Sequence, residues 1–110
     1  MELVNIETFA KVTPADMRKH DLRLAAWLAD AANGDSDACF DLGVAFSTGS
    51  HGVNADFVEA HKWFNLAAAK GHQEASWCRA DIADEMTARE IAEAQRRARE
   101  WLRAGDRSAA

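Results

Sequence analysis

The sequence predicts an all-α fold, a short solenoid of about five antiparallel helices. Alanine is abundant and Pro14 is the single proline, and this composition favours helices because alanine costs least in a helix interior. Apolar residues also recur at helical spacing in successive segments that end at glycines or turns. Finally, tryptophan recurs every 36 to 38 residues, as Trp27, Trp63 and Trp101. A repeat of this length that holds two helices is typical of an α-solenoid.

The first third of the chain predicts an arm followed by a long helix. Residues 1–12 begin with a strand-like alternation but have no partner strand nearby, so we expect an irregular arm over the first helix. Thr13 and Pro14 form a good helix start, a capping hydroxyl followed by proline at the first helical position. The first helix is therefore expected over residues 13–33, and Gly34 ends it because glycine adopts the left-handed conformation at low cost.

The middle of the chain predicts a helical hairpin over Ser36–Thr48 and Ala55–Lys70, joined by a glycine-containing turn. Gly43 lies inside the first of these helices, where it costs about 1 kcal/mol relative to alanine. A glycine tolerated there indicates that a neighbouring helix comes close. Asn54 is expected to cap the second helix, and Gly71 to end it.

Two further helices are expected over Glu74–Met86 and Ala88–Arg103, and residues 105–110 are expected to fray. Thr87 and Glu90 form a capping box at the start of the last helix. Because the connections are short, sequential helices should pack antiparallel. The residues expected on the apolar faces of the helices are Met17, Leu24, Leu28, Ala31, Ala38, Leu42, Ala45, Phe46, Phe57, Ala60, Phe64, Ala67, Ala68, Ile91, Ala94, Ala98, Trp101 and Leu102.

The segment 34–71 carries a regular pattern of small, aromatic and glycine residues. In order, it supplies Ala38, Phe40, Leu42, Gly43, Phe46, Gly49, Gly52, Val53, Asp56, Ala60, Trp63, Ala67, Ala68 and Gly71. This pattern resembles the Sel-one-like repeat, a relative of the tetratricopeptide repeat. One turn residue is extra, since Ser50 and His51 separate glycines that one residue usually separates in the family. The resemblance implies a right-handed α/α superhelix in which most of these residues serve packing.

The chain is therefore expected to be a single domain with one full repeat over residues 34–71. A degenerate repeat follows over residues 72–104, in which Trp77 occupies the place of Phe40. At the places of Leu42, Gly43 and Phe46 this second unit has Arg79, Ala80 and Ala83, and it lacks the glycine turn. Since a terminal repeat must show a polar face to water, the second unit is expected to act as a cap.

Composition excludes several function classes as first choices. The net charge of −5 argues against a nucleic-acid binder. We expect no membrane association, because no segment has a signal-peptide layout or the run of about 18 apolar residues that a membrane span needs. Cys39 and Cys78 match no metal or redox spacing, so they are expected to be reduced and mostly buried thiols of a cytoplasmic protein.

No catalytic, cofactor or metal site is expected. The four histidines, His20, His51, His61 and His72, show no paired spacing. His61 is expected to be partly buried with a satisfied hydrogen bond. Neither cysteine has a histidine at helical spacing, and no nucleophile-elbow motif is present. The arginines of the last helix alternate with glutamates, and this alternation predicts a solvated helix.

The candidate site is a stripe that the repeat motif leaves free. Its members share one face of each first helix of a repeat: Asp37, Asp41, Val44 and Thr48 on one, and Glu74, Cys78, Asp81 and Glu85 at the 37-residue offset on the other. In the family and its relatives, the first helices line a concave surface that binds extended peptides or partner helices. The resemblance thus implies an acidic groove that favours a basic partner. The alternative is a solvated acidic face without a ligand.

From these observations we expect a non-enzymatic adaptor or scaffold that binds another protein through the acidic groove. A self-associating module is the second hypothesis, in which the exposed end of the stack at the first helix pairs with another copy to form a homodimer, since a short solenoid leaves apolar surface uncovered. An enzyme is the third.

Overall fold

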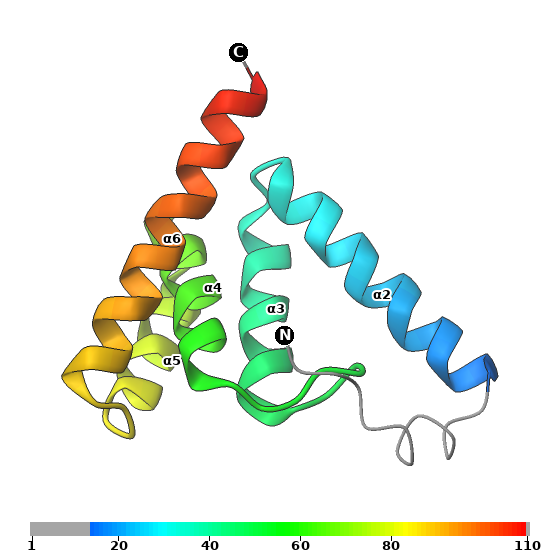
Figure 1. Ribbon diagram of the computed structural model, residues 1–110, viewed down its shortest axis with the longest axis horizontal. Coiled ribbons are helices and arrows are strands. Elements are labelled where there is room, and N and C mark those ends of the chain that lie inside the picture. Colours follow the sequence, from blue (N-terminus) through cyan, green and yellow to red (C-terminus); the bar gives the residue numbers. More distant parts are fainter. Residues whose placement is uncertain (1–13, 110) are drawn as a thin grey trace.

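The described part of the chain folds into an array of five helices (Figure 1). The computed structural model describes the backbone of residues 14–109 and the side chains of residues 22–105, so the predicted arm at residues 1–12 lies outside the described residues. The helices are α2 (Pro14–Ala32), α3 (Ser36–Thr48), α4 (Phe57–Ala69), α5 (Gln73–Ala83) and α6 (Ala88–Ala109), and the described part of the chain contains no strand. The predicted all-α class and the order of the helices are confirmed.

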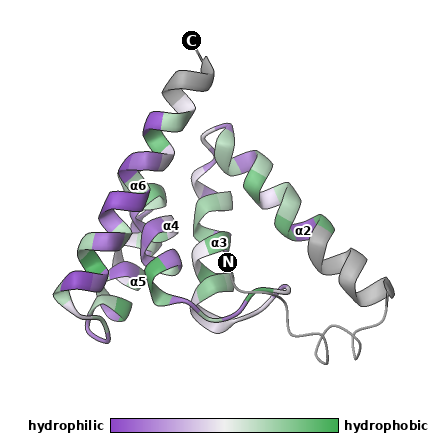
Figure 2. Ribbon diagram, viewed as in Figure 1, coloured by the Kyte–Doolittle hydropathy of each residue, from purple (hydrophilic) through white to green (hydrophobic). Residues whose placement is uncertain are grey.

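The α3–α4 hairpin forms the centre of the array. Helix α2 packs on α3, while α5 and α6 both pack on α4. In Figure 1, α2 and α6 lie on opposite sides of α3 and converge towards their C-terminal ends, and α5 lies behind α4. Figure 2 shows that hydrophobic residues are frequent along α3 and the second half of α2, whereas α6 is mainly hydrophilic.

Carboxylates cap the two helices of the hairpin. Asp35 Oδ1 accepts hydrogen bonds from the backbone N–H groups of Asp37 and Ala38 at the start of α3. Asp56 does the same at the start of α4, which begins two residues later than predicted. The prediction that Asn54 is the cap is wrong, because the backbone N–H of Asp56 donates to the carbonyl of Phe46 and keeps the preceding turn extended.

The last two helices differ in length from the prediction. The capping box is confirmed, since Thr87 N–H donates to Glu90 Oε1 and Glu90 N–H donates to Thr87 Oγ1. Helix α5 ends at Ala83, because the next backbone groups form turn hydrogen bonds to carbonyls three residues back. Helix α6 continues to Ala109, so the expected frayed tail is wrong for residues 105–109. A single glycine there costs only about 1 kcal/mol and does not stop the helix.

The core lies between α3 and α4. Its largest fully buried side chains are Trp63, Phe64, Leu42 and Cys39. Alanines of α3 and α4 are also buried, and the absence of larger side chains at those positions lets the two backbones approach. At Gly43, an added Cβ would lie 2.5 Å from Cδ1 and Cε1 of Phe64, so this position accepts only glycine without rearrangement.

Three residues expected on core faces are instead exposed: Leu28, Phe57 and Leu102. Phe57 is the first residue of α4 and extends past the packed part of the hairpin. Leu28 and Leu102 belong to α2 and α6, the outer helices, each of which packs mainly against a single helix of the hairpin. In a short solenoid such helices bury only part of their apolar face.

An ion-pair network holds α6 against α4. Arg97 donates to Glu59 Oε2 of α4 over 2.7 Å and to Glu93 Oε2 of its own helix over 2.8 Å. Lys62 Nζ lies 3.0 Å from Glu59 Oε1. Burial alone would raise the pKa of Glu59, but the hydrogen bonds and charges of Lys62 and Arg97 outweigh it and hold that pKa below its ordinary value.

Replacing Gly43→Ala should destabilise the protein. Overpacking against Phe64 costs about 1–3 kcal/mol, and the gain in helix propensity of up to about 1 kcal/mol offsets only part of it. We expect a lower midpoint of urea unfolding followed by circular dichroism. Gly105→Ala is the matched control, because nothing lies within 4 Å of its added Cβ. Equal stability of Gly43→Ala and the unmodified protein would contradict the close approach of α3 and α4.

Replacing Glu59→Gln should remove part of the acid dependence of stability. Because its pKa is lower in the folded chain than the ordinary 4.5, Glu59 stabilises the fold above that pH, and the contribution is lost as the pH falls through the folded value. We expect a loss of about 1–3 kcal/mol at neutral pH from the unpaired partners. Free energies of unfolding at several pH values would measure this, and Glu85→Gln, an exposed change, serves as the control. An unchanged pH dependence of the free energy of unfolding would show that the ion pairs of Glu59 do not stabilise the fold.

Candidate functional site

The predicted acidic stripe on α3 lies at the surface. The side chain of Asp37 is 85% exposed, Asp41 is half-buried, Val44 is half-buried and Thr48 is exposed. Burial raises the pKa of Asp41, and the nearby charges of Asp37 and Asp35 raise it further. The carboxylates at the start of α3 are thus close enough to repel one another.

The end of this stripe is engaged in local hydrogen bonds. Thr48 Oγ1 donates to the carbonyl of Val44 over 2.8 Å and lies 2.9 Å from Ser50 Oγ. Ser50 Oγ in turn lies 3.1 Å from His51 Nδ1. His51 has a positive φ of 58° and packs edge-on against Trp27 of α2, with ring centroids 4.8 Å apart. This chain of contacts fixes the glycine-containing turn against α2.

The second stripe follows α5 only in part. Glu74 and Asp81 are exposed on the helix, and Cys78 between them is half-buried. Burial raises the pKa of the Cys78 thiol, and the charges of Glu74 and Asp81 raise it further, so the three groups are neighbours. Glu85 was expected on the same helix face, but it lies in the turn after α5 and does not continue the stripe.

His72 joins the two stripes at one end. Its Nδ1 accepts a hydrogen bond from the backbone N–H of Ala75 and so caps α5. Its Nε2 lies 3.4 Å from Asp37 Oδ1, and its ring stacks on Phe40 with centroids 4.5 Å apart. Because the direct contact between α3 and α5 is small, the stripes meet near Asp37 and diverge from there, rather than running side by side along their length.

In the described part of the chain, no three His, Cys, Asp or Glu side chains are placed to hold a metal ion. Both cysteines are free, Cys39 being buried. His61 is only 4% exposed, so it is more deeply buried than expected, and its Nδ1 has no hydrogen-bond partner among the described residues. Burial and the charge of Arg79 lower the pKa of His61, which favours the neutral ring.

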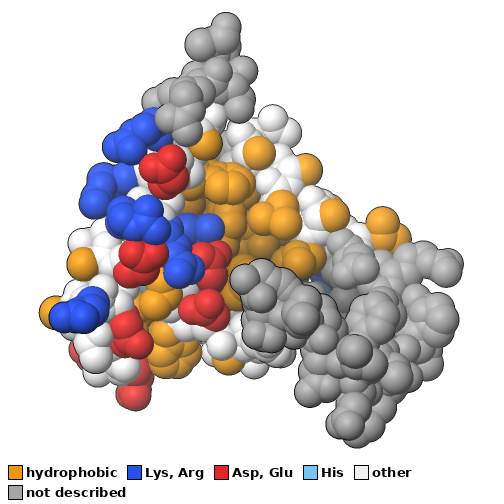
Figure 3. Space-filling model, viewed as in Figure 1, with side chains coloured by type: hydrophobic (Ala, Val, Ile, Leu, Met, Phe, Trp, Pro, Cys, Tyr) orange, Lys and Arg blue, Asp and Glu red, His pale blue; other side chains and the backbone are white. Residues whose placement is uncertain are grey.

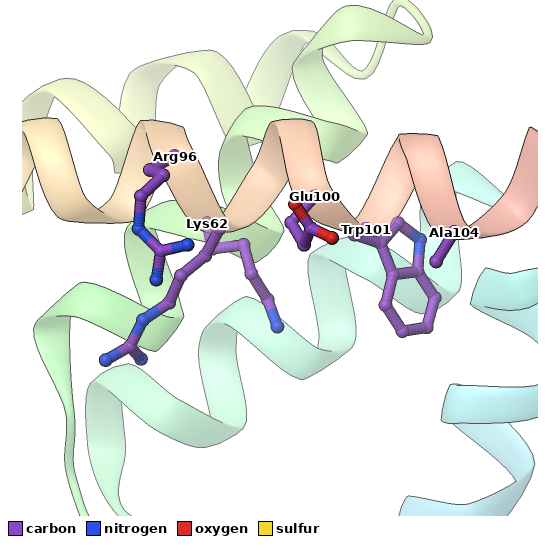
Figure 4. Close-up of a pocket in the computed structure, with 6 residues that line it drawn as sticks. Lys62, Arg96, Glu100, Trp101 and Ala104 are labelled. Atoms are coloured by element: carbon purple, nitrogen blue, oxygen red, sulfur yellow. The ribbon is translucent and has the colours of Figure 1, made fainter.

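A pocket that the sequence did not predict lies on the inner face of α6. It has a volume of about 280 Å³, and its lining residues are Lys62, Arg96, Arg97, Glu100, Trp101 and Ala104. In Figure 4 the Trp101 ring projects from α6, and the Lys62 side chain extends from α4 towards the same side. Lys62 Nζ also lies 4.2 Å from the centre of the Trp63 ring and 5.7 Å from that of Trp101.

A second pocket of about 280 Å³ adjoins the first and shares Trp101 with it. Its other lining residues are Ala31, Ala32, Asn33, Gly34, Lys70, Leu102 and Gly105. It therefore lies where the C-terminal ends of α2 and α4 meet the second half of α6. Figure 3 shows hydrophobic side chains gathered in the hollow between α6 and α2, with Lys and Arg side chains along the α6 side.

Helical periodicity alone could have suggested this surface only in part. The alternation of arginine and glutamate in α6 predicts a solvated helix, yet Arg96, Arg97 and Trp101 line one pocket because they share the inner side of the helix. Lys62 and Lys70 reach the same surface from α4, and Ala31 reaches it from α2. Which of these elements meet depends on the tertiary arrangement.

A comparison with protein-family models matched the Sel1 repeat over residues 36–72. No curated protein and no solved structure matched the chain. In the described residues, no helix has both the length and the apolar composition that crossing a membrane requires. The matched range covers α3, the glycine-containing turn and α4, and it ends at His72, the cap of α5. Residues 36–72 therefore form a Sel1 repeat, and this matched repeat is the α3–α4 hairpin.

Proposed function

We propose that this chain is a non-enzymatic adaptor that binds a basic segment of another protein through the acidic stripes of α3 and α5. Sel1 repeats generally mediate protein–protein interactions. The residues assigned to the contact are Asp37, Asp41, Val44, Thr48, Glu74 and Asp81 of the stripes, together with Glu85 of the turn after α5. We further propose that the adaptor works in the cytoplasm, with its two free cysteines reduced.

The observation that carries this proposal is the crowding of unneutralised carboxylates. Burial and then the charges of Asp37 and Asp35 raise the pKa of Asp41, and no lysine or arginine of the described residues forms an ion pair with these three carboxylates. Likewise, no lysine or arginine of the described residues forms an ion pair with Glu74 or Asp81 of α5. A partner that brings lysine or arginine relieves this repulsion. Such complementarity speeds association and selects the partner more than it adds affinity.

His72 gives the two stripes a common boundary. It contacts Asp37 of α3 and caps α5, so the α3 stripe starts next to the α5 stripe. A basic segment that enters at this end can contact carboxylates of both helices. Beyond it, the stripes diverge, and the segment follows one of them. The proposal therefore places the strongest attraction near Asp37, Asp41 and Glu74.

Reversing charge in the stripes should abolish partner capture. With the full chain as bait in a native cytosolic extract, we expect Asp41→Lys combined with Asp81→Lys to lower the recovery of bound proteins, measured by mass spectrometry, by about tenfold. Capture by the unmodified chain should also weaken with added salt, since exposed charges are screened. Asp30→Lys makes the same change on exposed α2 and should leave capture intact. If the double variant retains its partners and their salt dependence, the acidic stripes are not the binding surface.

A homodimer through the exposed end of the stack at the first helix is the alternative, and one observation favours it. Leu22 on α2 is 65% exposed, and Leu28 on the same helix is also exposed. Apolar side chains of this size at a free helix commonly mark an interface.

The dimer and the adaptor differ in how the melting temperature depends on protein concentration. Dissociation linked to unfolding makes the melting temperature of the dimer rise with concentration. Under the dimer hypothesis, Leu22→Ser should remove that dependence. A concentration-independent melting temperature and a monomeric mass in light scattering would exclude this homodimer.

A further inference from the structure

The inner side of α6 carries an excess of positive charge around an apolar centre. We define the α6 groove as the two adjoining pockets that share Trp101, with Lys62, Arg96 and Arg97 in one and Lys70 and Leu102 in the other. The groove occupies the hollow in which Figure 3 shows hydrophobic side chains beside Lys and Arg.

The cations of the groove outnumber the carboxylates that neutralise them. Lys62, Arg96 and Arg97 form ion pairs of 2.7–3.0 Å with two carboxylates, Glu59 and Glu93. Glu100 lines the same pocket and adds a third negative charge near Arg96. Among the described residues, Lys70 is the charged residue that lines the other pocket, and none of their carboxylates forms an ion pair with it. Glu100 at the rim is bonded to Arg103. An anionic ligand therefore meets cations that the chain does not fully neutralise.

The apolar part of the groove is uncovered. Leu102 is 48% exposed, and Trp101 is only half-buried although it packs edge-on against Trp63, with centroids 4.8 Å apart. Ala31 and Ala32 of α2 form the opposite wall. Two pockets of about 280 Å³ each offer room for one large aromatic side chain.

The outer face of α5 has the complementary composition. Trp77 is 62% exposed, and Glu74 and Asp81 lie three residues before it and four residues after it, on the same side of the helix. The repeat offset makes Trp77 the counterpart of Phe40, which packs against Phe64 and stacks on His72 of the next unit. In the described part of the chain, no aromatic side chain packs on Trp77 in this way.

We propose that the α5 face of one copy, formed by Glu74, Trp77 and Asp81, docks into the α6 groove of a second copy. Trp77 then lies against Trp101 and Leu102, and the two carboxylates reach Lys70 and Arg96. The proposal commits to a second copy as the occupant, because the same chain supplies an exposed aromatic residue between two carboxylates and a cationic groove with an apolar centre.

The arrangement of the two surfaces makes the contact head to tail. In Figure 1, α5 lies behind α4, and the groove is lined from α2, α4 and α6 without any residue of α5. One copy therefore cannot fill its own groove with its own α5, and each contact leaves one free groove and one free α5 face. Association of this heterologous kind produces short oligomers whose size grows with concentration, unlike a symmetric homodimer. It uses neither Leu22 nor Leu28 of α2.

Complementary charge reversals test the proposal with the full chain. The groove variant carries Lys70→Glu and Arg96→Glu, and the face variant carries Glu74→Lys and Asp81→Lys. Sedimentation velocity at low salt, from about 10 μM to about 1 mM, should show the unmodified chain forming oligomers with a dissociation constant of about 10⁻⁴ M. Each variant alone should associate at least about tenfold more weakly, because like charges now face each other.

An equimolar mixture of the two variants should associate again. In the mixture, the negative groove of the groove variant meets the positive α5 face of the face variant. The native groove of the face variant meets the native α5 face of the groove variant, so both contacts again join opposite charges. This restoration also shows that both variants are folded. Trp77→Ser should weaken association by about tenfold. Arg99→Glu, an exposed change on α6 outside both pockets, should have no effect.

Three results would overturn the proposal. The first is that the unmodified chain remains monomeric over the whole concentration range. The second is that the mixture of variants remains as weak as each variant alone. The third is that Leu22→Ser, which lies on α2, abolishes association, because the occupied surface is then the exposed end of the stack.

Discussion

The packing of the Phe64 ring against Gly43 is the contact on which the rest of the structure depends. It sets how closely α3 and α4 approach, and it places Trp63 and Leu42 in the fully buried core. Helices α2, α5 and α6 each pack against this hairpin. Because protein interiors are close-packed, a single added methyl group at Gly43 is transmitted to all of them. The matched Sel1 repeat coincides with this hairpin.

The motif residues and the candidate binding residues have separate roles. Glycine, alanine and tryptophan residues of the repeat are buried or form turns, and they determine how the helices stack. The side chains available to a partner are those that the motif leaves free, such as Asp37 and Asp81 on one surface and Lys70 and Arg96 on another. The short array thus presents two surfaces of opposite charge, one on the α3 and α5 side and one along α6.

The helices could be predicted from sequence because local signals define them. The capping box of Thr87 and Glu90 and the left-handed glycines give boundaries close to those observed. Asp56 replaced Asn54 as a cap because a backbone hydrogen bond to Phe46 keeps the turn extended, and this bond joins residues ten positions apart. The positions of Asp37 and Asp41 at the surface followed from periodicity. The link through His72 and the groove around Trp101 did not, because they depend on which helices meet.

The central claim is that the acidic stripes, supported by the α3–α4 hairpin, form the binding surface for a basic partner. Mapping backbone amide chemical shifts of the isotope-labelled chain during titration with a captured partner tests it most directly. The account predicts shifts concentrated on residues 37–48 of α3 and 74–81 of α5, decreasing as salt is added. Chemical-shift changes confined to α2, or the absence of such changes in both stripes, would contradict it.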